Sequence, residues 1–327
     1  MIRLLSVELS STKVNHMVFT QRQNSALKNK GVLCESFSLL GGIGIISFFR
    51  QIFYLQKKIK NFKPDIINAQ FGSYTSFVCS FFSLKHKYII TFRGSDLFLK
   101  ASIKNTNVIR GFMAHVLSQY SSLFAHRVIC VSEKLSDHLW FAKHKSVVIS
   151  DGVDLELFAE DTIPKARKIL NIPTNSKVLL FNAGYNPLIK RKDIADHVAS
   201  ILGSRISDFK YLVLDGNIRP NLVPVYLQAA NCLIVTSDSE GGPIIVKEAL
   251  ACNLPIVSVE VGDVVYMLND VEECIVVARE INQLVDRVEE IILRGNRSNG
   301  RKFCYRYDME LCVERLIKVY ACAAQIS

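Results

Sequence analysis

The sequence is poor in the patterns that bind metals, cross-link small domains or cross membranes. Its nine cysteines are odd in number and contain no Cys-x-x-Cys pair, so neither a disulfide framework nor a zinc site is predicted. No Asp-x-Asp triplet occurs, and the longest apolar stretch, residues 37–49, is shorter than the roughly 20 residues of a spanning helix. We therefore expect free thiols in a reducing cytosol, no metal and no transmembrane segment.

Acidic residues are scarce in the first half of the chain. Residues 1–150 contain 20 Lys and Arg against six Asp and Glu, whereas residues 151–327 contain 20 against 24. Such a basic half suits nucleic acid, an anionic membrane surface or a phosphorylated acceptor. Because no zinc finger, helix-turn-helix or aromatic-rich RNA motif is present, nucleic acid is not expected as a partner.

The 327 residues are enough for two domains, and short apolar runs alternate with helical patterns throughout. Strands are predicted at 2–7, 32–37, 65–69, 88–92, 128–131, 147–149, 178–181, 211–214, 232–235, 256–259 and 274–277. Helices are predicted at 18–30, 45–60, 73–83, 108–123 and 309–323. This α/β order predicts two Rossmann-like, doubly wound parallel-sheet domains, residues 1–155 and 156–327, facing across a cleft. A polar linker is expected at 160–176.

The most informative segment is residues 237–262. Glu240 and Glu248 stand eight positions apart, with Gly241, Gly242 and Pro243 directly after the first. A strand, a glycine turn and a helix whose first residue is Pro243 would aim backbone N–H groups and the helix dipole at an anion. Two carboxylates beside such a turn suit a sugar nucleotide. Alternatively, both glutamates lie on the surface of an ordinary amphipathic helix.

This segment resembles the E-x7-E signature of retaining glycosyltransferases of the GT-B fold, glycosyltransferase family 4. The matching residues are Glu240-Gly241-Gly242-Pro243, Glu248-Ala249, Ala251-Cys252 and Pro255-Ile256-Val257. The resemblance implies that Glu248 binds the ribose hydroxyls and that Glu240 contacts the donor sugar or braces the loop. It also implies that the last helix packs back on the first domain.

The family presents an Arg and a Lys to the donor diphosphate, from a loop that resembles residues 181–193 here. Tyr185 stands where the family has the Arg, so Lys190 and Arg191 are the candidates for the two positive charges. The alternative is that residues 190–192 form a solvated helix start. Without an Asp-x-Asp triplet, we expect these cations and N–H groups to stabilise the leaving diphosphate directly.

The first half resembles the family at two further loops, with substitutions. Arg93 replaces the His of T-x-H-G-x-D, and because Arg stays protonated it is no general base. Arg93 could bind phosphate, while Asp96 orients an acceptor hydroxyl or pairs with Arg93. Asn68 and Gln70 stand where His is common, and Asp151 takes the Asn place of N-G-V-D. His16 is a further candidate near the cleft.

The resemblance implies a cytoplasmic, metal-independent, retaining hexosyltransferase without a cofactor. Its donor would be a UDP- or GDP-sugar, and its acceptor a hydroxyl of a glycan or lipid-linked glycan in envelope polysaccharide synthesis. A peripheral position at the inner face of the membrane would account for the basic half. The alternatives are a non-catalytic GT-B subunit that binds membrane or a partner enzyme, and a sugar-nucleotide epimerase. Residues 215–225 offer only a short loop beside the base site, so the nucleobase stays open.

Overall fold

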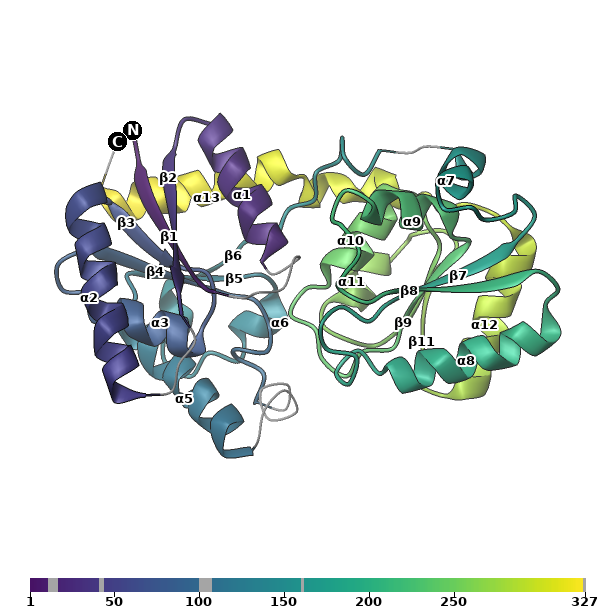
Figure 1. The fold of residues 1–327 in the computed structure, drawn as a ribbon, viewed down its shortest axis with the longest axis horizontal. Coiled ribbons are helices and arrows are strands. Elements are labelled where there is room, and N and C mark those ends of the chain that lie inside the picture. Colours follow the sequence, from purple (N-terminus) through teal and green to yellow (C-terminus); the bar gives the residue numbers. More distant parts are fainter. Residues whose placement is uncertain (11–16, 41–43, 100–107, 160–161, 326–327) are drawn as a thin grey trace. The chain divides into compact units, whose positions relative to one another are not determined.

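The computed structural model describes residues 1–10, 17–40, 44–99, 108–159 and 162–325. The chain forms two compact units, one of Met1–Gly152 with Met309–Ser327 and one of Val153–Asp308 (Figure 1). Each unit is an α/β domain around a parallel sheet, and the GT-B-like pair of Rossmann domains predicted from the sequence is confirmed. The chain leaves the first unit at Gly152, three residues before the predicted boundary.

The first unit contains a six-stranded sheet in the order β2-β1-β3-β4-β5-β6. Every predicted strand of this half is confirmed to within two residues at each end, and all the pairings are parallel. The strands are β1 (Arg3–Leu9), β2 (Leu33–Leu39), β3 (Ile66–Ala69), β4 (Lys87–Phe92), β5 (Arg127–Cys130) and β6 (Ser146–Val148). The inner strands β3, β4 and β5 are almost entirely buried and mostly apolar, as expected for a sheet covered on both faces.

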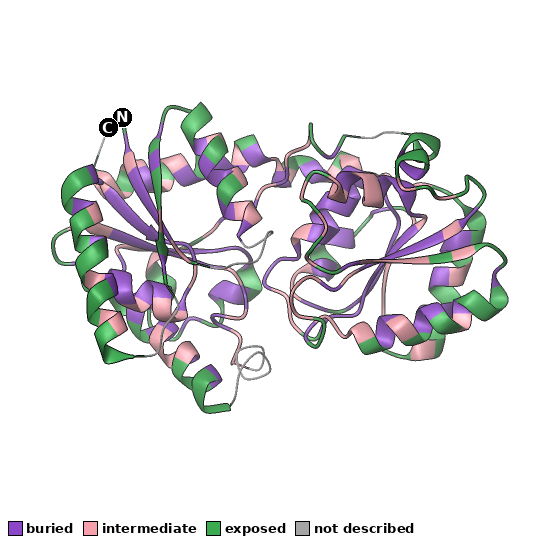
Figure 2. Ribbon diagram, in the orientation of Figure 1, coloured by how far each residue is buried: buried purple, intermediate pink, exposed green. Residues whose placement is uncertain are grey.

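Helices cover both faces of this sheet. One face packs against α1 (Val18–Asn29) and α13 (Met309–Ala324), whose apolar residues share a core with Leu4, Ile66 and Ile129. The other face packs against α2 (Ile45–Phe62) and α3 (Ser73–Ser80), and α5 (Val108–Phe124) packs against α3. The short helices α6 (Glu133–Ser136) and η1 (Lys143–Lys145) precede β6. Figure 2 shows the sheet strands as the most buried layer.

The carboxy-terminal helix belongs to the first unit. Cys312, Val313, Leu316 and Tyr320 recur at helical spacing and are all buried, and the Tyr320 hydroxyl accepts a 2.7 Å hydrogen bond from Asn68 Nδ2. Gly152 permits this return, because a Cβ atom there would lie 2.7 Å from Met309 Cα.

The second unit contains a five-stranded parallel sheet in the order β11-β10-β9-β7-β8. Its strands are β7 (Lys177–Asn182), β8 (Phe209–Leu214), β9 (Cys232–Val235), β10 (Ile256–Val259) and β11 (Cys274–Val277). Its helices are α7 (Ile163–Ile169), α8 (Lys192–Arg205), α9 (Val223–Ala229), α10 (Ile244–Ala251), α11 (Val264–Leu268), α12 (Ile281–Arg294) and η2 (Gly300–Tyr307). The expected linker at 160–176 is wrong in part, because α7 occupies its middle and buries Ala166 and Arg167.

The sheet order of the second unit decides where its polar loops lie. β7 and β9 are neighbours, and β10 and β11 follow on the far side of β9. Because parallel strands end at the same edge, the loops that follow these four strands gather there. Among the described helices, none combines the length and hydropathy needed to cross a bilayer.

Candidate functional site

Two loops of the second unit meet through an ion pair between predicted site residues. Lys190 Nζ, after β7, lies 2.5 Å from Glu240 Oε1, after β9. Their side chains are 20% and 13% exposed, so the pair is accessible but partly shielded from water. Ser237 Oγ donates a 2.8 Å hydrogen bond to the same carboxylate oxygen, and Thr236 Oγ1 donates to the Lys190 carbonyl at 2.8 Å. The strand β9 exit therefore fixes both the cation and the carboxylate.

The helix after Glu240 begins one residue later than predicted. Pro243 is the N-cap of α10, with φ −64° and ψ 110°, and Ile244 is the first helical residue. Gly241 and Gly242 precede it, so the helix N-terminus and its partial positive charge lie directly after Glu240. Glu248 is the fifth residue of the helix and is 7% exposed. Its position one turn along α10 agrees with the local architecture predicted from the sequence.

A glycine from the next loop holds the Glu240 backbone in place. Gly262, after β10, has φ +53°, and a Cβ atom there would lie 2.8 Å from the Glu240 carbonyl oxygen. A side chain at this position would therefore clash with the loop that carries Glu240, in a backbone conformation that already favours glycine. The sequence analysis included Gly262 only as the end of the signature and gave it no role.

Arg191, the second predicted cation, is engaged by acidic neighbours. It is the left-handed N-cap of α8, and its guanidinium bonds Asp193 at 2.7 Å and Asp238 at 3.4 Å. The Asp193 side chain raises the pKa of Arg191. Arg279, just after β11, bonds Asp238 at 2.5 Å and the Ser237 carbonyl at 2.6 Å. Sequence reasoning missed Arg279, although it is the first charged residue after β11, where ligands of such sheets bind.

In the first unit, Arg93 lies in a buried polar network. Its guanidinium pairs with Asp151, and Nη2 donates to Gln70 Oε1 at 2.8 Å and Gln23 Oε1 at 3.3 Å. The guanidinium also lies 4.3 Å from the centre of the Phe19 ring. Burial lowers the pKa of Arg93 to about 10, which leaves it charged at neutral pH.

Asp96 is fully buried and accepts hydrogen bonds from loop amides. The donors are the backbone N–H groups of Gly72 at 3.0 Å, Arg93 at 3.2 Å and Gly94 at 2.8 Å. Asp96 braces the loop through the backbone N–H of Arg93, whereas the Arg93 side chain pairs with Asp151. These hydrogen bonds fix the loop that carries Arg93, so that its guanidinium reaches Asp151. The other expected role of Asp96, orienting an acceptor hydroxyl, stays a prediction.

Helix α1 adds polar groups that the sequence analysis did not single out. Thr20, Gln23 and Asn24 are buried at helical spacing, and within the described part of the chain Thr20 Oγ1, Gln23 Nε2 and Gln70 Nε2 have no hydrogen-bond partner. Buried polar groups are normally satisfied by protein, water or a ligand. The signal in the sequence was the polar face of residues 20–24 on a helix that follows β1. His16 lies outside the described residues.

The candidate binding groups of the second unit are a lysine, backbone N–H groups and two carboxylates. Among the residues that the structure describes, no group of three His, Cys, Asp or Glu is arranged to hold a metal ion. The N-terminus of α10, Lys190 and the Glu240 and Glu248 carboxylates are the groups that this edge of the sheet presents. Chemically they can bind a phosphate and hydroxyl groups together.

Sequence comparisons assign both halves of the chain. Residues 1–157 match the family described as Glycosyltransferase Family 4, and residues 211–302 match Glycosyl transferases group 1. An uncharacterized glycosyltransferase of Methanocaldococcus jannaschii is 25% identical over 71% of this chain and 68% of its own length. A Bacillus subtilis protein, provisionally named teichuronic acid biosynthesis glycosyltransferase TuaC, is 26% identical over 63% of this chain and 56% of its own.

Solved structures share the fold over nearly the whole length. Sucrose-phosphate synthase from Thermosynechococcus elongatus superposes with a TM-score of 0.80 at 16% identity, covering 100% of both chains. The Anabaena protein HepE in complex with UDP-glucose has a TM-score of 0.76 at 14% identity, covering 98% of this chain and 100% of its own. With matches in both halves and a two-domain fold common to these neighbours, the chain belongs to the group 1 glycosyltransferases of the GT-B fold.

Proposed function

We propose that the protein is a metal-independent, retaining hexosyltransferase that uses a UDP- or GDP-sugar. The acceptor would be a hydroxyl of a glycan or lipid-linked glycan in envelope polysaccharide synthesis, at the cytoplasmic side of the membrane. The UDP-glucose complex of the Anabaena neighbour supports a nucleotide-sugar donor, and the name of the Bacillus subtilis relative supports the polysaccharide setting.

The observation that carries this proposal is the Lys190–Glu240 pair at the N-terminus of α10. When the bond between the anomeric carbon and the diphosphate breaks, negative charge develops on the leaving group. Lys190 and the backbone N–H groups at Gly241 and Gly242 would stabilise that charge. Such electrostatic stabilisation lowers the activation barrier substantially when no metal is present. Glu240 would hold Lys190 in position and contact the donor sugar.

The remaining groups would bind the rest of the substrates. The two oxygens of Glu248 suit the two ribose hydroxyls. Arg279 would support the loop that leads to Glu240 by holding Ser237 and Asp238. In the first unit, Gln23 Nε2 and Gln70 Nε2, which have no partner among the described residues, would donate hydrogen bonds to the hydroxyls of the acceptor. Retention without a protein nucleophile would follow from attack on the same face as the leaving group, with the donor phosphate accepting the proton.

Transfer by the purified protein from UDP- and GDP-sugars tests the proposal. We expect Lys190→Met to lower kcat by about 10²-fold or more, as for the loss of one oxyanion-stabilising group. Glu248→Gln should mainly raise the KM for the donor, because ribose binding precedes the chemical step. Lys192→Met is the matched control, since Lys192 pairs with Asp196 on the exposed side of α8.

Equal activity of Lys190→Met and Lys192→Met would contradict the assignment of the cation. Conversion of the sugar nucleotide without any acceptor would identify an epimerase instead. Donor binding without turnover across a broad acceptor panel would favour a non-catalytic subunit. Activity that disappears with a chelator and returns with a divalent ion would overturn metal independence.

A further inference from the structure

Helix α5 has the reverse of the usual amphipathic pattern. Its buried positions hold small or polar residues, namely Gly111, His115, Ser118, Gln119, Ser121 and Ser122. Its exposed positions include Val108, Ile109, Phe112, Met113, Tyr120 and Leu123, each 45% to 76% exposed. A helix at the surface of a water-soluble domain normally has the opposite arrangement.

Close packing accounts for the inner face of α5 but leaves the outer face unexplained. Ser118 Oγ accepts a 2.7 Å hydrogen bond from the Ser73 amide at the start of α3, and a Cβ atom on Gly72 would lie 2.5 Å from that oxygen. Such close contact admits only small side chains. The serine hydroxyls are satisfied within the helix, as Ser121 Oγ donates to the Leu117 carbonyl at 2.6 Å. Nothing in this packing requires large apolar residues on the outside.

Helix α2 is apolar on its outer side as well. Ile45, Ile46, Phe49 and Phe53 are 77%, 85%, 63% and 62% exposed, while Leu55 and Ile59 on the opposite side are buried in the core. At about 100° per residue, Lys57 and Lys60 continue the outer stripe toward the carboxyl end of the helix. The outer side of α2 therefore consists of an apolar half followed by a basic half.

Helices α2, α3 and α5 lie on the same side of the sheet, where α3 contacts both α2 and α5 (Figure 1). The Phe48 ring of α2 stacks on Phe77 of α3 at 5.8 Å between centres and meets Phe81 edge-on at 5.6 Å. Phe81 is 54% exposed, and nearby Leu84 is 95% exposed. Figure 2 shows exposed residues along α2 and α5. Exposed apolar residues on this scale mark an interaction surface.

The charge on the outer faces of α2 and α5 indicates an anionic partner. Neither α2 nor α5 contains an Asp or a Glu. Residues 1–150 as a whole contain 20 basic against six acidic residues. A basic rim beside exposed Phe and Ile is the composition of helices that lie in the plane of an anionic bilayer, with apolar side chains among the acyl chains and lysines at the headgroups.

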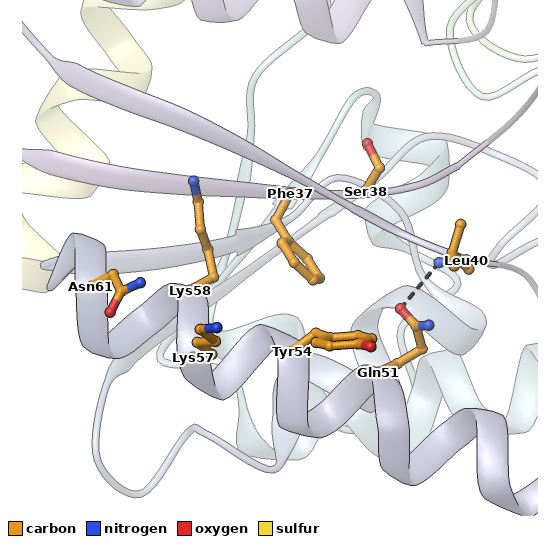
Figure 3. A pocket seen from close by; sticks show the side chains of 8 residues that line it. All are labelled: Phe37, Ser38, Leu40, Gln51, Tyr54, Lys57, Lys58 and Asn61. Atoms are coloured by element: carbon orange, nitrogen blue, oxygen red, sulfur yellow. Dashed lines mark hydrogen bonds between the residues drawn. The ribbon is translucent and has the colours of Figure 1, made fainter.

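A pocket beside the α2 stripe offers room for a headgroup. It has a volume of about 430 Å³ and lies between the end of β2 and α2 (Figure 3). Phe37 and Tyr54 line it together with Lys57, Lys58 and Asn61. Gln51 Oε1 closes one end by accepting a 3.2 Å hydrogen bond from the Leu40 amide. Lys57 lies between Phe53 and Tyr54 around the helix axis, so it borders both the stripe and the pocket.

We propose that the outer faces of α2 and α5 bind the surface of an anionic phospholipid bilayer. The apolar side chains of both helices enter the interfacial layer, and Lys57 and Lys60 contact phosphate headgroups, one of which occupies the pocket. A second copy of the chain is the other candidate occupant, but both faces would then carry the same excess of basic over acidic residues, which opposes self-association. The proposal concerns a surface of the first unit alone and does not depend on glycosyl transfer.

Sedimentation of the full chain with sucrose-loaded vesicles tests the proposal. We expect binding to phosphatidylglycerol-containing vesicles, weaker binding at high salt, and little binding to pure phosphatidylcholine. Phe49→Ser with Phe53→Ser should weaken partitioning into the vesicles by about tenfold or more, because two rings that would enter the bilayer are lost. Ile109→Ser with Phe112→Ser should weaken it independently. Lys57→Gln with Lys60→Gln should weaken it by about tenfold and reduce the salt dependence.

Matched controls lie on the second unit. Ile169→Ser with Leu293→Ser replaces apolar residues that are 54% and 55% exposed, and Lys168→Gln with Lys302→Gln replaces exposed lysines. These variants should bind vesicles like the parent, and urea unfolding should show that all variants are folded. Equal binding to neutral vesicles, or unchanged binding by the α2 and α5 variants, would overturn the proposal. Self-association that the aromatic substitutions abolish, without vesicle binding, would assign the face to a second copy and overturn it too.

Discussion

Arg93 and Asp151 are two departures from the residues that are usual in the family, and the structure joins them. The sequence resemblance places a His at position 93 and an Asn at position 151, and the chain has a cation and an anion instead. Their side chains are 5% and 8% exposed and form an ion pair. Each substitution alone would bury an unbalanced charge, so the pair explains why both occur together.

We predict that Arg93→Met destabilises the first unit by about 3–5 kcal/mol, because it removes the guanidinium from a buried carboxylate. The double variant Arg93→His with Asp151→Asn should be clearly more stable than Arg93→Met, since the Asp151 carboxylate is no longer left buried without its partner. Urea unfolding followed by circular dichroism measures both. A single variant that unfolds at the parent's urea concentration would show that the pair is not structurally important.

At the level of elements, the return of α13 depends on the crossing at Gly152. We predict that Gly152→Ala costs about 1–3 kcal/mol of unfolding free energy, because its Cβ would lie 2.7 Å from Met309 Cα and the helix would have to shift. Gly44→Ala is the control, since a Cβ there meets no atom of the described residues within 4 Å. Thermal denaturation compares the two, and equal midpoints would contradict this account of the crossing.

Secondary structure was largely predictable, because β9 is an uninterrupted apolar run and β10 is interrupted only by Ser258, and turn residues bound both. Helix α7 was missed because its polar sequence, with Pro164 in its first turn and Pro173 after its end, favours a linker. In the structure Arg167 is buried and donates a 3.1 Å hydrogen bond to the Ala229 carbonyl. The site was predictable where the motif is local, as for Glu240 and Glu248. Arg279 was not, because its role depends on β11 lying beside β10 in the sheet.

At the scale of the whole molecule, stability should depend on pH through the first unit. His86, His115 and His126 all lie in it, and burial lowers the pKa of each below the ordinary value of 6.5. Below pH 6.5 these histidines therefore bind more protons in the unfolded chain than in the folded chain. The free energy of unfolding consequently rises as the pH increases toward 6.5. His126 Nδ1 accepts a 3.2 Å hydrogen bond from the Tyr88 amide, which requires the neutral ring.

We predict that the melting temperature falls as the pH is lowered from about 7 to about 5. His126→Gln should weaken this dependence, because it removes one group that must be protonated. His144→Gln, at an exposed position, should leave it unchanged. Differential scanning calorimetry over this range measures the slope, and an identical slope for His126→Gln and the parent would contradict the assignment.

The division of the chain imposes an order on its synthesis. Val153–Asp308 is complete before α13 leaves the ribosome, whereas the first sheet lacks the helix that covers Ile66 and Ile129 until α13 emerges. An apolar face of that sheet is therefore left open to other nascent chains and chaperones while the second unit already folds. Translation speed over the codons of residues 153–324, rather than over the first half, then sets how long the nascent protein remains prone to aggregation.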